Sequence, residues 1–147
     1  MSVAIDEWHR IVRERDFDAL VDLLADDVVF HSPIVHSPQE GKAITTLYLK
    51  AAFGVFGGSP PPSADAGASE SKSAGNSKFG YVREVVGERD AVLEFVTEMD
   101  GITVNGVDMI HWNDAGKIVD FKVMVRPLKA INKVHGLMAS MIEKLKG

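Results

Sequence analysis

Hydrophobic residues change their spacing halfway along this chain, and that change restricts the folds open to it. Before residue 57 they recur with the spacing of amphipathic helices, interrupted by a short strand at 28–30. After residue 78 they alternate with polar residues, as in strands that bury one face. Because the helices precede the strands, the pattern favours an α+β fold with an antiparallel sheet over a parallel α/β fold.

The boundaries of these elements follow from capping and turn residues. The first three helices are predicted over residues 3–14, from 17 to Asp26-Asp27, and over 42–56. The strands of the second half are predicted over residues 79–86, 91–99, 102–112 and 117–125. Asp100-Gly101 predicts a hairpin turn, and Asn105-Gly106 predicts a β-bulge. Pro127 suits the first position of a final amphipathic helix.

Residues 1–147 are expected to form one domain, because this length suits a single hydrophobic core. Residues 57–78 interrupt the pattern with a run rich in Gly, Ser, Pro and Ala. Such a run cannot bury enough apolar surface to offset the entropy lost on ordering. We therefore expect a flexible loop insertion there, with a lid over a pocket as the alternative.

The composition argues against several kinds of partner. The chain has no cysteine, which excludes disulfides and thiolate metal sites and fits a cytoplasmic location. A net charge of −5 without a Lys/Arg cluster argues against nucleic acid. No apolar run reaches the roughly 20 residues of a membrane span, and the N-terminal residues do not resemble a signal peptide. We expect neither a cofactor nor a membrane association.

Asp108 is the residue that bears most directly on function. It interrupts the apolar run 107–112, where an unpaired carboxylate would cost several kcal/mol. It must therefore be paired, protonated or directed into a wet cavity. Asp108 shares one strand face with Ile110 and Trp112. If that face is concave, an apolar pocket would raise the pKa of Asp108 and make it a neutral hydrogen-bond donor. The alternative is a structural carboxylate bonded to a helix or loop donor.

Two His-Ser-Pro triplets follow the first predicted strand, at 31–33 and 36–38. Their histidines lack the i, i+4 spacing of helical ligands, and a zinc site needs at least three protein ligands, so we expect no metal. His31 or His36 could act as a general base through water at a pocket mouth. Ser32 beside a histidine suggests a hydrolase pair, although the nucleophile-elbow pattern is missing.

Two stretches resemble the nuclear-transport-factor-2-like superfamily. Residues 17–30, followed by Ser32-Pro33 and Gly41, are similar to its opening, and residues 106–119 are similar to its last two strands. The 57–78 insert and the final helix lie outside the resemblance. It implies a cone-shaped half-barrel, in which a curved antiparallel sheet wraps around the N-terminal helices. SnoaL-like polyketide cyclases, ketosteroid isomerases and limonene epoxide hydrolases belong to this superfamily.

The resemblance to ketosteroid isomerases is partial at the level of single residues. Their oxyanion-hole aspartate falls on Asp108, their general-base aspartate on Ser32 and their phenolic tyrosine on Trp8. Ser32 cannot abstract a carbon-bound proton unaided, so that mechanism is expected to be absent. Asp108 also lies near the acid/base aspartate of SnoaL-like cyclases. The Asp–Arg–Asp set of epoxide hydrolases is not matched, because Gly106 replaces the arginine and Asp120 has the wrong strand parity.

Together with the buried Asp108, the resemblance implies a cone pocket for a small, largely apolar, oxygenated molecule of polyketide, steroid or terpenoid type. Asp108 would be its polar anchor or acid/base, and an enzyme of this kind would be an isomerase, cyclase or hydrolase. The expected lining residues are Trp8, Ser32, Tyr48, Phe95 and Trp112. The alternative is a non-catalytic ligand-binding or protein-interaction module of the same fold.

The convex face of the expected sheet mixes charged and apolar side chains, which suits a two-fold interface. Its expected members are Val92, Glu94, Val96, Glu98, Met109, His111, Lys122, Met124 and Arg126. Tyr81 and Arg83 are also expected at the surface or on this face. Because the superfamily includes dimers, the resemblance implies a homodimer through the convex face.

Overall fold

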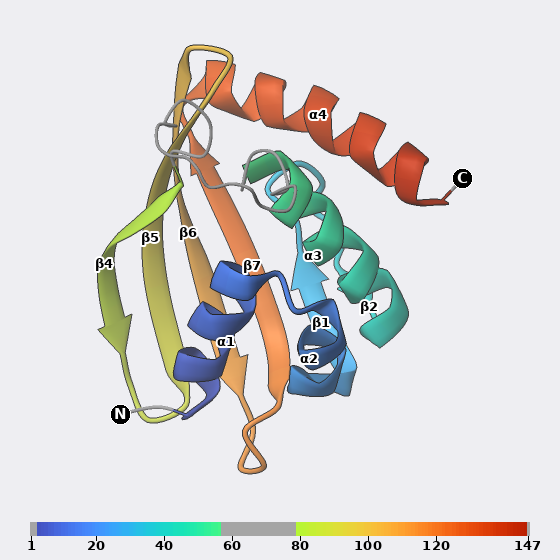
Figure 1. The fold of residues 1–147 in the computed structure, drawn as a ribbon, viewed down its shortest axis with the longest axis vertical. Helices are drawn as coiled ribbons and strands as arrows, with labels where there is room; N and C mark the ends of the chain where they lie inside the picture. Colours follow the sequence, from blue (N-terminus) through green and yellow to red (C-terminus); the bar gives the residue numbers. More distant parts are fainter. Residues whose placement is uncertain (1–2, 57–78, 147) are drawn as a thin grey trace.

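The computed structural model describes residues 3–56 and 79–146, so the loop insertion expected at 57–78 lies outside the described residues. The elements follow the predicted order of helices, strands and a final helix (Figure 1). The helices are α1 (Val3–Glu14), α2 (Phe17–Leu23), α3 (Lys42–Phe56) and α4 (Leu128–Lys146). The strands are β1 (Leu24–His31), β2 (Gln39–Glu40), β4 (Gly80–Val86), β5 (Asp90–Met99), β6 (Ile102–Trp112) and β7 (Ile118–Arg126).

The six strands form one curved, unclosed sheet in the order β2-β1-β7-β6-β5-β4. Helices α1, α2 and α3 lie against its concave face, which confirms the predicted α+β architecture (Figure 1). The sheet is mixed, because β1 runs parallel to β7 while the other neighbouring pairs are antiparallel. Turn signals predict the directions within the β4–β7 meander. These turn signals carry no information about the direction of β1, because α3 lies between β1 and the meander in the sequence.

Helix α2 ends earlier than predicted. Asp16 caps its N-terminus by accepting a hydrogen bond from the Ala19 amide at 3.1 Å. Its C-cap, Leu24, is already extended and pairs with Ile118 of β7. Asp26-Asp27 was predicted to end the helix and instead lies inside β1, at the irregularity between Leu24 and Val29. Burial of Leu24 in the core favours this early change to strand.

The prediction of a β-bulge at Asn105-Gly106 is also wrong, because β6 pairs in continuous register there with both β5 and β7. Gly106 is required for space instead: a Cβ on it would lie 2.5 Å from Cζ of Phe95 and 2.7 Å from the Met124 carbonyl oxygen. The Asp100-Gly101 turn is confirmed, with φ angles of 52° and 81°. Two positive φ angles are typical of a two-residue type I′ hairpin.

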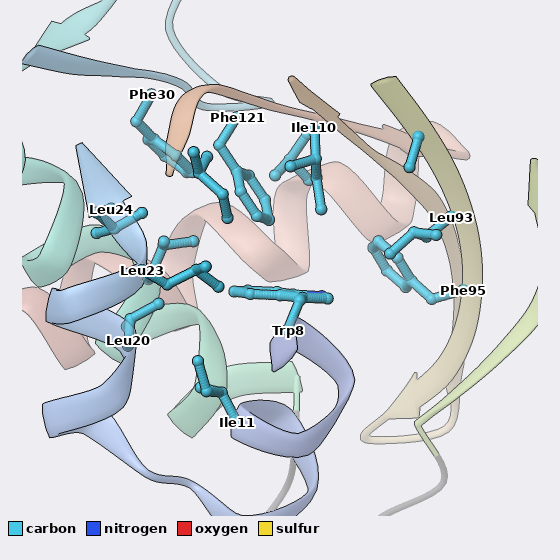
Figure 2. Packing of buried hydrophobic residues seen from close by; sticks show 14 of the residues in the cluster. Trp8, Ile11, Leu20, Leu23, Leu24, Phe30, Leu93, Phe95, Ile110 and Phe121 are labelled. Atoms are coloured by element: carbon cyan, nitrogen blue, oxygen red, sulfur yellow. The ribbon is translucent and has the colours of Figure 1, made fainter. Parts of the chain in front are cut away.

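The core lies between the concave face of the sheet and the first three helices. Inward positions alternate along the central strands, so that Leu93, Phe95, Ile110 and Phe121 are buried. Figure 2 shows Trp8 of α1 among these side chains. Their burial is the main source of stabilisation, at roughly 1.5–3 kcal/mol for each large apolar side chain.

Helix α4 packs against α3 and also contacts β6 and β7 at one end of the sheet (Figure 1). The contact is close, since a Cβ on Gly54 would lie 2.9 Å from Cε of Met141. This arrangement explains why α3 is apolar nearly all round: its two sides face the sheet and α4. Within the described residues, no helix is both long and apolar enough to span a bilayer.

Candidate functional site

A cavity of about 70 Å³ lies between α1, α3 and the concave face of the sheet. Helix α1 contributes Trp8 and Val12, whose i, i+4 spacing places them on one helical face, and Arg15 follows directly after the helix. Helix α3 contributes apolar side chains, including Phe53 and Phe56. The sheet side contributes Phe79, Tyr81, Phe95, Asp108, Phe121 and Val123. The cavity is therefore aromatic, with a few polar groups in its wall.

Three of these polar groups are joined by hydrogen bonds. The Trp8 indole Nε1–H donates to the Tyr81 hydroxyl oxygen at 3.1 Å, and the Tyr81 hydroxyl donates to Asp108 Oδ2 at 2.7 Å. Asp108 is only 6% exposed. Within the described residues, Tyr81 is the hydrogen-bond partner found for its carboxyl group. The carboxyl group therefore sits in an apolar surrounding with one neutral donor.

This environment changes the protonation of both groups. Burial raises the pKa of Asp108 from its ordinary 3.8 to about 7, although the Tyr81 hydrogen bond opposes the rise. Burial, followed by the charge of Asp108, raises the pKa of Tyr81 well above its usual range. Near pH 7 a substantial fraction of Asp108 is a neutral acid that can donate a hydrogen bond, while Tyr81 keeps its proton.

The structure brings three of the predicted site residues to the cavity: Trp8, Phe95 and Asp108. Tyr48 and Trp112 are not among its lining residues. Tyr48 instead stacks on Phe30 of β1, with 5.4 Å between the ring centroids. Trp112 shares a strand face with Asp108, as expected, but lies beside the turns at the far end of the sheet, at a shallow groove lined also by Arg89 and Asp114.

The residues of the His-Ser-Pro segment also lie away from the cavity. Strand alternation buries Phe30 and turns His31 to the outer face, where its Nε2 lies 3.1 Å from Asp120 Oδ2. His36 is exposed in the following loop. Ser32 accepts hydrogen bonds from the amides of Ile34 and Val35, so its hydroxyl organises that loop. Neither histidine supplies a second titratable group beside Asp108.

Tyr81 is the residue that sequence analysis placed wrongly. It was expected at the surface or on the dimer face, whereas its hydroxyl lies inside the cavity. Strand β4 shifts register against β5 between Tyr81 and Arg83. Arg83 does face outward, where its Nε lies 3.3 Å from a Glu94 carboxyl oxygen. A hydrophobic pattern on a short edge strand gives no signal for such a shift.

Arg15 also lines the cavity, although no sequence pattern indicated it. It follows the last turn of α1 with a φ of 55°, in the left-handed region that non-glycine residues rarely adopt. Burial lowers the pKa of its guanidinium. Among residues 3–56 and 79–146, no group of three or more His, Asp or Glu side chains is arranged to hold a metal ion.

Comparison with known proteins relates this architecture to a family. A family model described as a SnoaL-like domain matches residues 5–121. A steroid delta-isomerase from Pseudomonas aeruginosa shares 30% identity at a TM-score of 0.80, over 97% of this chain and 90% of that one. A bacterial protein with a cystatin-like fold from Silicibacter pomeroyi shares 26% identity at a TM-score of 0.77, over 95% and 85%.

A more distant structure is SalBIII, described as an epoxide hydrolase/cyclase-like enzyme in pyran ring formation. It shares 18% identity at a TM-score of 0.59, over 85% of this chain and 89% of that one, which supports the fold alone. No curated protein matches the sequence.

Proposed function

The chain belongs to the SnoaL-like domain family, with a nuclear-transport-factor-2-like fold, and we propose that its cavity binds a small, largely apolar, oxygenated molecule. The observation that carries the proposal is the buried Asp108, with Tyr81 as its donor, in an otherwise aromatic wall. A protonated carboxyl group there donates a hydrogen bond to a carbonyl, ether or hydroxyl oxygen. The aromatic wall accepts the apolar body of the same molecule.

The ligand class follows from chemistry and size. A cavity of about 70 Å³ is small beside the roughly 300–1,000 Å³ pockets of drug-sized ligands. A single ring with one oxygen function suits it, and a larger polyketide, steroid or terpenoid skeleton requires the aromatic side chains to move. The 30% identical relative described as a steroid delta-isomerase supports a ring system that carries oxygen.

Binding is favoured over two-group acid/base catalysis, because neither His31 nor His36 lies at the cavity. A transformation would have to use Asp108 alone as acid and base. Its pKa of about 7 suits that role, since proton transfer is most effective when the pKa lies near the working pH. An isomerase, cyclase or hydrolase activity that depends on Asp108 is therefore the second candidate. A non-catalytic protein-interaction module remains the third.

The test compares acetophenone with ethylbenzene, which lacks the carbonyl oxygen, by NMR titration at pH 6 and pH 8. We expect acetophenone to bind more tightly to the wild type, with an advantage that declines above pH 7 as Asp108 ionises. Asp108→Asn keeps a neutral donor, so it should retain that advantage at pH 8. Asp108→Leu should remove it at both pH values. Equal binding of both probes to every variant would contradict the proposal.

We further propose a homodimer through the outer face of the sheet. Val85, Val92 and Met109 pair side by side across β4, β5 and β6, and Met124 lies on the same face of β7. Each is at least 36% exposed. Charged side chains border them, including Glu94 with its Arg83 partner. An apolar patch bordered by both signs of charge suits self-association about a two-fold axis. A cytoplasmic location stays a prediction from composition.

A further inference from the structure

We infer that His9 and Glu84 are positioning residues of the site, which tie the edge strand β4 to α1 beside Tyr81. By fixing β4 they hold the Tyr81 hydroxyl group on Asp108. Neither His9 nor Glu84 is among the residues that line the cavity, so both act through Tyr81. The inference rests on the proposed function, because it assigns the residues that keep its polar anchor in place.

The register shift in β4 turns Glu84 to the same face of the sheet as Tyr81. In a regular strand, side chains three residues apart point to opposite faces. Tyr81, however, pairs with Phe95 of β5. Glu84 pairs with Leu93, and both of these β5 residues are buried on the inner face. Because cross-strand partners share a face, the shift between Tyr81 and Arg83 directs Tyr81 and Glu84 toward the helices.

Two consecutive residues of α1 meet these two side chains. The Trp8 indole N–H donates to the Tyr81 hydroxyl oxygen at 3.1 Å. Nε2 of His9 lies 2.9 Å from Oε2 of Glu84. The His9 ring also packs edge-on against the Tyr81 ring, with 5.2 Å between the ring centroids. Tyr81 is therefore contacted by Trp8 at its hydroxyl group and by His9 at its ring.

Strand β4 depends on these contacts because it lies at the edge of the sheet. In the sheet formed by the described residues, its neighbour is β5, and its other side has no strand (Figure 1). Its apolar residues after Tyr81 bury little surface, since Val82, Val85 and Val86 are all exposed. The contacts between the side chains of α1 and β4 therefore decide how closely Tyr81 is held to the site.

The contact between His9 and Glu84 acts through charge. It has the distance of an ion pair, but the buried Nε2 of His9 does not meet the geometry of a hydrogen bond. Partly exposed ion pairs contribute little to global stability, so loss of this one should loosen β4 without unfolding the chain. The charge of Glu84 also reaches the site. Burial and the charge of Asp108 raise the pKa of Tyr81, and the charge of Glu84 adds to that rise.

Glu84→Gln tests the inference in the ligand-free protein, with carboxyl carbon NMR shifts that report the pKa of Asp108. Loss of a negative charge can only lower this pKa, whereas a loosened Tyr81 hydroxyl group no longer stabilises the carboxylate and lets the pKa rise. We expect a rise, to a value between those of the wild type and Tyr81→Phe. In a Tyr81→Phe background, Glu84→Gln should cause no rise.

His9→Gln is the second variant and should also raise the pKa of Asp108. When His9→Gln and Glu84→Gln are combined, the rise should equal the larger single effect and not the sum, because both break one contact. Glu88→Gln and His135→Gln are the matched controls, since both residues are exposed. Neither control should change the pKa of Asp108. Melting temperatures establish that each variant is folded.

An unchanged or lowered pKa of Asp108 in Glu84→Gln would overturn the inference. A rise of the same size in Glu88→Gln, or a rise that persists in the Tyr81→Phe background, would do the same. If acetophenone binds with its expected dependence on Asp108 while Glu84→Gln leaves the pKa unchanged, the proposed function stands and the inference fails. If the pKa rises as expected while acetophenone and ethylbenzene bind equally, the proposed function fails and the positioning of Tyr81 stands.

Discussion

Tyr81 on β4 donates its hydroxyl hydrogen to Asp108 on β6 across the intervening strand β5. Inward side chains on strands that are not neighbours can meet in this way because the sheet is concave toward the helices. Phe95 of β5 lies opposite both Tyr81 and Gly106, and the missing side chain at Gly106 leaves room for its ring. The position of the Tyr81–Asp108 hydrogen bond therefore depends on two uncharged residues, Phe95 and Gly106.

Asp108→Asn should stabilise the protein at pH 8. The pKa of Asp108 rises from 3.8 to about 7 on folding, so the folded state binds more protons than the unfolded state between those values. Wild-type stability must therefore fall as the pH rises through this window, by up to roughly 4 kcal/mol in total. Asparagine escapes this cost, and we expect a gain of roughly 1–4 kcal/mol at pH 8 and little near pH 4.

Urea denaturation followed by circular dichroism measures the difference at both pH values. Asp120→Asn is the control, because Asp120 lies on the outer face beside His31 and is partly exposed. It should show no comparable gain at pH 8. A loss of stability in Asp108→Asn at pH 8 would mean that the carboxylate is a satisfied structural group, and the neutral-donor role would have to be abandoned.

Tyr81→Phe should raise the pKa of Asp108 further above 7. The hydroxyl of Tyr81 stabilises the charged carboxylate, and its removal leaves desolvation unopposed. The variant also leaves the Trp8 indole N–H without its acceptor, at a cost of roughly 1–3 kcal/mol. Carboxyl carbon NMR shifts followed against pH report the Asp108 pKa directly. An unchanged or lowered value would show that Tyr81 does not set the protonation of Asp108.

The order of the helices and strands and the burial of Asp108 could be predicted from the sequence, because both follow from local patterns, whereas the parallel pairing of β1 with β7 could not. A carboxylate in an apolar strand is visible without any knowledge of neighbours. Its partner was not visible, since the register shift in β4 that separates Tyr81 from Arg83 depends on pairing with β5. Arg15 was not predicted as a cavity residue for a similar reason. It follows a helix, and only the tertiary arrangement of α1 over the sheet brings it to the cavity.

The prediction for Trp112 named the correct face of its strand but the wrong position along that strand. Trp112 shares the inward face of β6 with Asp108, yet four residues along a strand move a side chain roughly 13 Å. It therefore lies beside the turns, outside the cavity. Periodicity predicts which face of an element is buried, and it does not predict which part of that face meets a cavity.

Met109→Glu should produce a monomer if the outer face of the sheet is a dimer interface. Met109 is 37% exposed and lies beside Val92 of β5. A pair of glutamates near a two-fold axis would repel each other and lose apolar contact. The molecular mass measured by sedimentation velocity should fall from twice the chain mass in the wild type to the chain mass of 16.0 kDa in the variant. Val35→Glu, in the exposed loop after β1, is the control that should leave the wild-type mass unchanged. A monomeric wild type would refute the dimer.

Gly106→Ala should damage both stability and the cavity, and the two effects should appear together. The added Cβ would meet the Phe95 ring at 2.5 Å and the Met124 carbonyl at 2.7 Å, so either the ring moves or the β6–β7 pairing opens. Overpacking of this kind costs roughly 1–3 kcal/mol, which lowers the melting temperature by several degrees. Because Phe95 lines the cavity, a displaced ring should also weaken acetophenone binding.

Gly80→Ala is the matched control for this change, because Gly80 begins β4 and a Cβ there meets nothing within 4 Å. Its melting temperature should stay the same or rise slightly, since alanine loses less backbone entropy than glycine on folding. Differential scanning calorimetry and the acetophenone titration measure both variants. If Gly106→Ala melts with the wild type and binds the probe equally well, Phe95 must have room elsewhere. The cavity would then not depend on the contact between this ring and the glycine.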